Sequence, residues 1–238
     1  MTYINRNPIY ILMSSFDAIS TPLPNRLKDG LDRIAAVLRA DQWSTSNAVG
    51  LNPTQAHVLS FLAGRDTAGI RVKEIAAHLG VSQPTATDSI AALERKNLVH
   101  KTVAADDARA VGVRITDQGR EMLKAIGIAA SATETALAML APAEQADLLL
   151  LFIKLVRGLQ LAGSIPVQRL CVTCRHFRPN IYSDADQPHH CAFVNAAFGD
   201  RHLRLDCGDH EQADPATQAA NWTAFDTGSA TLRAPNPI

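Results

Sequence analysis

Residues 70–99 read IRVKEIAAHLGVSQPTATDSIAALERKNLV, and this stretch decides the fold. Two helical segments flank the tight sequence HLGVS, in which Gly80 permits a sharp turn. Ser82 is a preferred N-cap for the second helix, and Pro84 is tolerated in its first turn because the missing N–H breaks no helical hydrogen bond. The stretch therefore predicts a helix-turn-helix.

The second of these helices has an apolar side for the core and an opposite, mainly polar side. Ala86, Ile90 and Leu93 recur at steps of three and four, so we expect them in the core. The residues that must then face away from the core are Gln83, Thr85, Thr87, Asp88 and Ala91.

Two more helices are predicted before this motif. Apolar positions that recur every three or four residues from 25 to 41 indicate an amphipathic helix. The segment NPTQAHVLSFLAG at 52–64 offers Pro53 at a helix start and Gly64 as a stop. We assign residues 1–24 to an irregular N-terminal arm.

The segments after the motif change character twice. Beyond Leu98, alternating apolar residues around a polar loop at 104–110 predict a β-hairpin. Long Ala- and Leu-rich stretches at 117–140 and 142–161 then predict two helices. Their apolar content exceeds what one small domain can cover, which indicates association of two chains.

Composition sets limits on these interpretations. The chain has 238 residues, 47% of them apolar and 5% aromatic, which favours two mainly helical units. The 23 basic and 23 acidic residues cancel, so nucleic-acid binding has to come from local clusters of charge. The longest apolar run, at 148–153, is too short for a bilayer, and the N-terminus lacks a signal-peptide core. We expect a cytoplasmic protein without membrane contact.

Residues 51–123 resemble the winged helix-turn-helix core of the MarR family. Helix, turn, recognition helix, wing and the closing ITDQGRE at 115–121 follow in that family's order. The flanking helices at 25–41 and 117–161 stand where the family has its dimerisation helices. The resemblance implies a homodimeric transcriptional regulator, not an enzyme, that binds a pseudo-palindromic double-stranded DNA operator. It places the domain at 25–162, with the DNA-binding core at 51–117.

The resemblance also implies how DNA is contacted. The helix from Gln83 would enter the major groove, and the hairpin tip at 107–109 would reach the minor groove, whose negative potential suits an arginine. Lysines and arginines near these elements are phosphate candidates by charge, although a solvated surface explains them equally well. The DNA-binding candidates are Gln83, Pro84, Thr85, Thr87, Asp88, Lys73, Lys96, Lys101 and Arg109, with Arg95 and Arg114 as further cations.

Asp88 departs from the family pattern. Relatives often carry a basic residue there, whereas this carboxylate would repel phosphate or accept a hydrogen bond from a cytosine amino group. We expect weaker DNA affinity or an unusual operator.

A cysteine-rich module is predicted at 165–212. Cys171, Cys174, Cys191 and Cys207 have the spacing C-x2-C-x16-C-x15-C, and in a reducing compartment such thiols are metal ligands or redox groups. One close pair and two separate cysteines disfavour two zinc knuckles and favour a [4Fe-4S] cluster. The spacing is similar to that of high-potential iron-sulfur proteins and of the small cluster-binding subunits of arylalkylsuccinate synthases. We expect an apolar wrapping from Phe177, Phe193, Phe198 and Leu205.

Other interpretations of this module remain open at this point. Histidines could replace a cysteine in a Zn²⁺ site, or the thiols could form a metal-free switch. We expect His190 and His176 as groups behind the ligands. Residues 213–238 are Ala-, Thr- and Pro-rich and predict a loosely ordered tail, in which Trp222 and Phe225 are able to dock.

Three functional hypotheses follow. The first is a regulator whose DNA affinity depends on an iron-sulfur cluster and hence on oxygen, nitric oxide, iron or redox balance, with the long helices repositioned when the cluster changes. The second is a regulator with structural zinc that responds to a small aromatic ligand. The third is an electron-transfer protein, which lacks support because no nucleotide loop or catalytic triad is visible.

Overall fold

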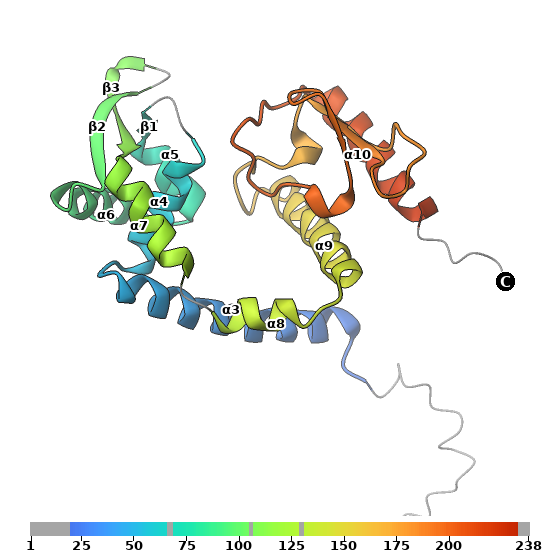
Figure 1. Ribbon diagram of the computed structural model, residues 1–238, viewed down its shortest axis with the longest axis horizontal. Coiled ribbons are helices and arrows are strands. Elements are labelled where there is room, and N and C mark those ends of the chain that lie inside the picture. The colour runs from blue at the N-terminus through green and yellow to red at the C-terminus, as the bar shows by residue number, and fades with distance from the viewer. Residues whose placement is uncertain (1–19, 66–68, 105–106, 129–130, 233–238) are drawn as a thin grey trace, which may run out of the picture.

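The chain folds into two lobes that are connected along one side (Figure 1). We call residues 49–128 the winged lobe and residues 142–232 the cysteine lobe. The computed structural model describes residues 20–65, 69–104, 107–128 and 131–232, and at 104, 107–110, 128 and 229–232 it describes the backbone alone.

The ends of the first two helices have local causes. Helix α4 (Pro53–Ala63) begins with a capping box in which the Gln55 N–H donates to Asn52 Oδ1 at 2.9 Å, and it ends at Gly64. Helix α3 (Leu23–Ala48) is longer than the predicted 25–41. It continues past residue 41 because no glycine or proline follows there before Gly50, whose φ of 71° belongs to the left-handed region.

The helix-turn-helix is confirmed. Helix α5 (Val72–Leu79) ends at Gly80, whose φ is 66°, and α6 (Gln83–Arg95) follows. The Ser82 hydroxyl caps α6 by accepting a hydrogen bond from the Thr85 N–H at 3.2 Å. Ala86, Ile90 and Leu93 are buried as predicted.

The predicted hairpin is present and has a third strand beside it. Strands β2 (Val99–Ala104) and β3 (Asp107–Ile115) pair antiparallel, and β1 (Ile70–Arg71) pairs with the other edge of β3. A two-residue strand is too short to show alternation, so no sequence pattern indicates β1. A β-carbon at Gly112 would lie 2.6 Å from Gly69 Cα, so the strands need a glycine there.

The prediction of one helix over 117–140 is wrong. Helix α7 (Asp117–Ile128) is followed by a separate helix α8 (Ala132–Ala138) and then by α9 (Pro142–Leu161). A capping box causes the new start, because the Glu134 N–H donates to Ser131 Oγ and the Ser131 N–H donates to the Glu134 carboxylate. Helix α8 then lies along α3 (Figure 1).

The cysteine lobe combines a small sheet with two helices. Strands β4 (Phe177–Arg178), β5 (His189–Cys191) and β6 (Ala196–Phe198) form the sheet in that order, and single 3-10 turns lie at Cys171–Thr173 and Asp200–His202.

The prediction of a loosely ordered tail from 213 onward is wrong. Helix α10 (Pro215–Leu232) follows Asp214, whose side chain accepts a hydrogen bond from the Thr217 N–H at 3.0 Å. Phe225 anchors the helix, since it is fully buried among other aromatic rings. The expectation that Trp222 and Phe225 dock is thus confirmed, but they do so on a helix.

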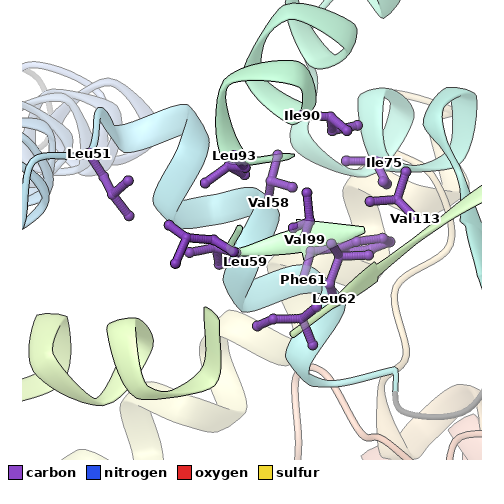
Figure 2. Close-up of a cluster of buried hydrophobic side chains, with 12 residues drawn as sticks. Leu51, Val58, Leu59, Phe61, Leu62, Ile75, Ile90, Leu93, Val99 and Val113 are labelled. Carbon is purple, nitrogen blue, oxygen red and sulfur yellow. The ribbon is translucent and has the colours of Figure 1, made fainter. Parts of the chain in front are cut away.

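Each lobe has its own core. In the winged lobe, side chains of α4, α5, α6 and the sheet converge (Figure 2), among them Leu59, Ile75 and Val113. In the cysteine lobe, Leu150 and Ile153 of α9 pack with aromatic residues of the sheet and α10. Helix α9 therefore shares the second core, although the composition changes only near 164–166.

The predicted fold class is confirmed: the chain is mainly α-helical with a winged helix-turn-helix and small β-sheets. Within the described residues no single helix has both the length and the apolarity of a membrane span. Helices α8 and α9 reach that level only together, across a bend of 119°.

Candidate functional sites

The first candidate site is the outer face of α6. The five residues predicted to contact DNA on this helix are all exposed: Gln83, Pro84, Thr85, Thr87 and Asp88. They occupy the first half of α6, at the positive end of the helix dipole. This surface is suited to a negatively charged partner, except at Asp88.

The hydroxyl groups of this face already have partners. Thr85 Oγ1 lies 2.7 Å from Ser82 Oγ, and Thr87 donates to the Gln83 carbonyl oxygen at 2.9 Å. Both hydroxyls are thereby held in a fixed orientation, while their oxygen atoms keep further acceptor capacity.

The predicted phosphate contacts differ in their surroundings. Lys96 Nζ donates to the Gly50 carbonyl oxygen at 2.5 Å, and Lys101 pairs with Glu94 at 2.7 Å. Both would have to exchange these partners for phosphate, whereas Lys73 is exposed on α5. Arg95 and Arg114 are exposed on α6 and β3, and the side chain of Arg109 lies outside the described residues.

The second candidate site is a cavity in the cysteine lobe. Its volume is about 140 Å³, and all four cysteines line it, although Cys191 and Cys207 are far apart in sequence. Phe177, Phe193 and Phe198 also line it, as predicted, together with Val194. Leu205 is not among the lining residues and is 38% exposed.

Arg204 approaches two of the sulfur atoms. Its backbone N–H donates to Cys171 Sγ at 3.3 Å, and its guanidinium Nη1 lies 3.7 Å from Cys207 Sγ. The pKa of the Cys171 thiol is raised to about 11, chiefly by burial; the Arg204 N–H opposes this shift and the other three cysteines contribute to it. A thiol with this pKa keeps its proton at neutral pH unless a metal displaces it. Sequence reasoning missed Arg204, although its place three residues before Cys207 was a usable signal.

The histidines separate into different roles. His176 lines the cavity and pairs with Glu211 at 3.0 Å, and His202 also lines it. His190 is not among the lining residues, since its Nδ1 lies 3.0 Å from the Tyr182 hydroxyl. His189 is fully buried and structural: its Nδ1 accepts from the Asn180 N–H, so its Nε2 donates to an aspartate, Asp200, at 2.8 Å.

A contact between the lobes lies directly beside Cys207. Arg65, just after α4, forms two hydrogen bonds with the Asp206 carboxylate, at 3.1 and 3.2 Å. The two residues are separated by 141 positions in sequence, and no sequence pattern marked either of them.

The four thiols line one cavity without forming a compact set of ligands around one point. Among the described residues, no three or more His, Cys, Asp or Glu side chains are close enough together to hold one metal ion. A zinc ion needs four ligands at about 2.0–2.3 Å from one point, whereas a four-iron cluster binds cysteines at separate corners. An apolar wall, hydrogen-bond donors to sulfur and a nearby cation are features that clusters use.

Part of the winged lobe matches a known protein family. Residues 49–110 match the family model described as MarR family. The match spans α4 to the wing, the segment in which the helix-turn-helix is observed. No curated protein matches the chain.

Solved structures of several bacterial proteins are similar to part of the chain. The MepR–DNA complex of S. aureus is 20% identical and covers 58% of this chain and 99% of its own, with a TM-score of 0.47. The YusO protein of Bacillus subtilis is 22% identical and covers 60% and 99%, with a TM-score of 0.42. CouR of Rhodococcus jostii, bound to p-coumaroyl-CoA, is 20% identical and covers 46% and 76%, with a TM-score of 0.41. Scores below 0.5 carry no functional argument.

Proposed function

We propose, with the MarR-family match of residues 49–110 as the premise, that the protein is a homodimeric DNA-binding transcriptional regulator. The observation that carries this proposal is the exposed polar face in the first half of α6, on a helix-turn-helix with a wing beside it. In this arrangement α6 enters the major groove and the hairpin segment at 107–109 approaches the minor groove.

Gln83 is the side chain best suited to read a base. It is exposed at the first position of α6, and its amide has both donor and acceptor atoms, as bidentate recognition of adenine requires. Q83A should lower affinity for a DNA duplex selected from a random pool by about 5- to 150-fold, the equivalent of about 1–3 kcal/mol. Q187A, an exposed glutamine of the cysteine lobe, is the matched control. Fluorescence anisotropy measures both, and equal affinities for the two variants would contradict this docking.

The dimer is supported by an apolar stripe on α3. Leu23, Leu27, Leu31, Ile34 and Leu38 follow each other at helical spacing and are each 38–60% exposed. Because such a stripe costs free energy in water, we assign a second copy of the chain as its cover. L27E should produce monomers in light scattering, whereas K28E on the same helix should not.

We further infer that Cys171, Cys174, Cys191 and Cys207 hold an iron-sulfur cluster, with [4Fe-4S] favoured. The four thiols around one cavity, their apolar wall and the Arg204 donors support the cluster, which would supply a site sensitive to oxidants and to iron supply. The four cysteines would ligate the cluster, the phenylalanines would surround it, and Arg204 would place a backbone N–H beside Cys171 and a positive charge beside Cys207.

Metal analysis tests the cluster directly. After anaerobic purification we expect a brown protein with about four iron and four sulfide per chain. C191S should lose iron, whereas H190Q, adjacent in sequence but turned toward Tyr182, should keep it. Zinc without iron or sulfide would instead favour the structural-zinc regulator. DNA binding itself is tested separately, because Q83A leaves the cysteine lobe intact.

A further inference from the structure

We propose that Arg65 and Asp206 form the switch contact through which the cysteine site alters DNA binding. The inference rests on the proposed regulator and its cluster, and it names the route between them. The sequence pattern favours the long helices as the elements that transmit a change at the cysteine site to the DNA-binding face. The structure offers a more direct connection, because Asp206, the residue before Cys207, contacts the winged lobe.

The contact is specific in geometry and largely shielded from water on one side. The Arg65 side chain is 10% exposed, and both of its terminal nitrogens bind the two oxygens of the Asp206 side chain, which is 42% exposed. Arg65 Nη1 also donates to the Phe61 carbonyl oxygen at 2.9 Å. A two-point ion pair of this kind fixes orientation, so a displaced Asp206 leaves a buried guanidinium without its carboxylate.

A second arginine ties the same segment to the end of α4. Arg169 donates to the carbonyl oxygens of Gly64 and Gly208, and its own carbonyl oxygen accepts from the Cys207 N–H at 3.0 Å. A β-carbon at Gly208 would lie 3.4 Å from the Gly64 carbonyl oxygen. Residues 206–208 are therefore packed against the winged lobe.

The other side of this segment belongs to the cysteine site. Arg204 binds Cys171 Sγ through its backbone and approaches Cys207 Sγ with its guanidinium. With a cluster bound, Cys207 is a ligand and its position is fixed. Without the cluster, only weak contacts hold the sulfur, and Asp206 gains freedom to leave Arg65.

Arg65 also contacts an aromatic ring of α4, and that ring contacts a histidine ring of the helix-turn-helix. The Arg65 guanidinium lies 3.6 Å above the Phe61 ring, and the Phe61 ring lies 4.3 Å from the ring of His78 on α5. Because Phe61 is buried, a shift of Arg65 changes the packing between α4 and α5. Helix α5 positions α6, so the change reaches the DNA-binding face.

The experiment compares DNA affinity with and without the cluster. Each protein is measured by anisotropy on the duplex selected by the wild type, first as purified without oxygen and then after iron removal by a chelator with an oxidant. We expect the two wild-type affinities to differ by about 5- to 150-fold. In D206N and in R65Q the ratio should fall to within about twofold, and the double variant should lower it no further.

R175Q is the matched control. It breaks an exposed ion pair with Glu211 beside Cys174, on the same lobe but outside the contact with the winged lobe, and it should keep the wild-type ratio. Iron content and melting temperature are recorded for every variant. If D206N and R65Q are folded, hold iron and keep the full ratio, this inference is overturned while the proposed function stands. A wild-type protein that holds iron but binds the duplex equally well in both states likewise overturns this inference alone, whereas a wild-type protein that selects no duplex overturns the proposed function.

Discussion

Asp88 offers the sharpest test of how this protein meets DNA. It is exposed on α6, one turn after Pro84, and it carries a negative charge at a position where a basic residue would favour phosphate. If the first half of α6 lies in the major groove, this carboxylate faces phosphates or base edges. Changing it to lysine should convert a repulsive position into a phosphate contact.

The expected size of the effect follows from counterion release. Each phosphate neutralised changes the slope of log affinity against log salt by about −0.9. Two protomers in a dimer give a slope change of about −1.8. Between about 200 mM and about 50 mM salt, D88K should therefore gain roughly 12-fold more affinity than the wild type gains.

The assay is anisotropy on the selected duplex and on a random duplex across this salt range. E121K is the control, because it changes charge by the same amount on the exposed surface of α7. A gain on random DNA with a loss on the selected duplex would identify Asp88 as a base reader. An unchanged slope on both duplexes, in a folded D88K protein, would refute docking through this half of α6.

Three further predictions concern stability and the wing. F225A should destabilise the cysteine lobe by about 3–5 kcal/mol, because a fully buried ring leaves a cavity, and thermal unfolding measures this. Burial lowers the pKa of His78 below its ordinary 6.5, with Arg65 adding to the shift, so the unfolded chain binds more protons near that value. Stability should therefore fall as pH drops through 6.5, and H78Q should show a flatter dependence in urea unfolding. G112A should separate β1 from β3, since its β-carbon would overlap Gly69, and both melting temperature and DNA affinity should decrease; unchanged values would show that the strands adjust freely.

Local chemistry explains why the winged lobe was predictable. The turn at Gly80 and the caps at Asn52 and Ser82 depend on residues within a few positions, and each acts as its type implies. The sequence spacing also grouped the four cysteines, and in the structure they line one cavity. That they bind a metal stays a prediction.

Other features depend on contacts that no local pattern records. The helix break before α8 uses Ser131 and Glu134, which the high Ala content around them obscured. Helix α10 has a weak amphipathic pattern and is fixed chiefly by the burial of Phe225. The Arg65–Asp206 pair joins positions 141 residues apart, and such pairs emerge only from the folded chain.

Two structural connections between the lobes could transmit a change at the cysteines to the winged lobe. One runs along α8 and α9 and is fastened to α3, where the Asp41 carboxylate accepts hydrogen bonds from Thr133 N–H and Oγ1 at 2.9 and 2.6 Å. The Thr133 donors lower the pKa of Asp41, so the carboxylate stays ionised and keeps these hydrogen bonds at neutral pH. The other is the Arg65–Asp206 contact.

The second route should respond first to a change at the cysteines. Helices α8 and α9 are held by continuous backbone hydrogen bonds, and Cys207 is not part of them, whereas Asp206 adjoins Cys207 directly. D41A should therefore lower melting temperature by loosening α8, yet keep the difference in DNA affinity between cluster-bound and cluster-free protein. Loss of that difference in folded D41A, with the ratio retained in D206N, would assign the signal to the helices instead.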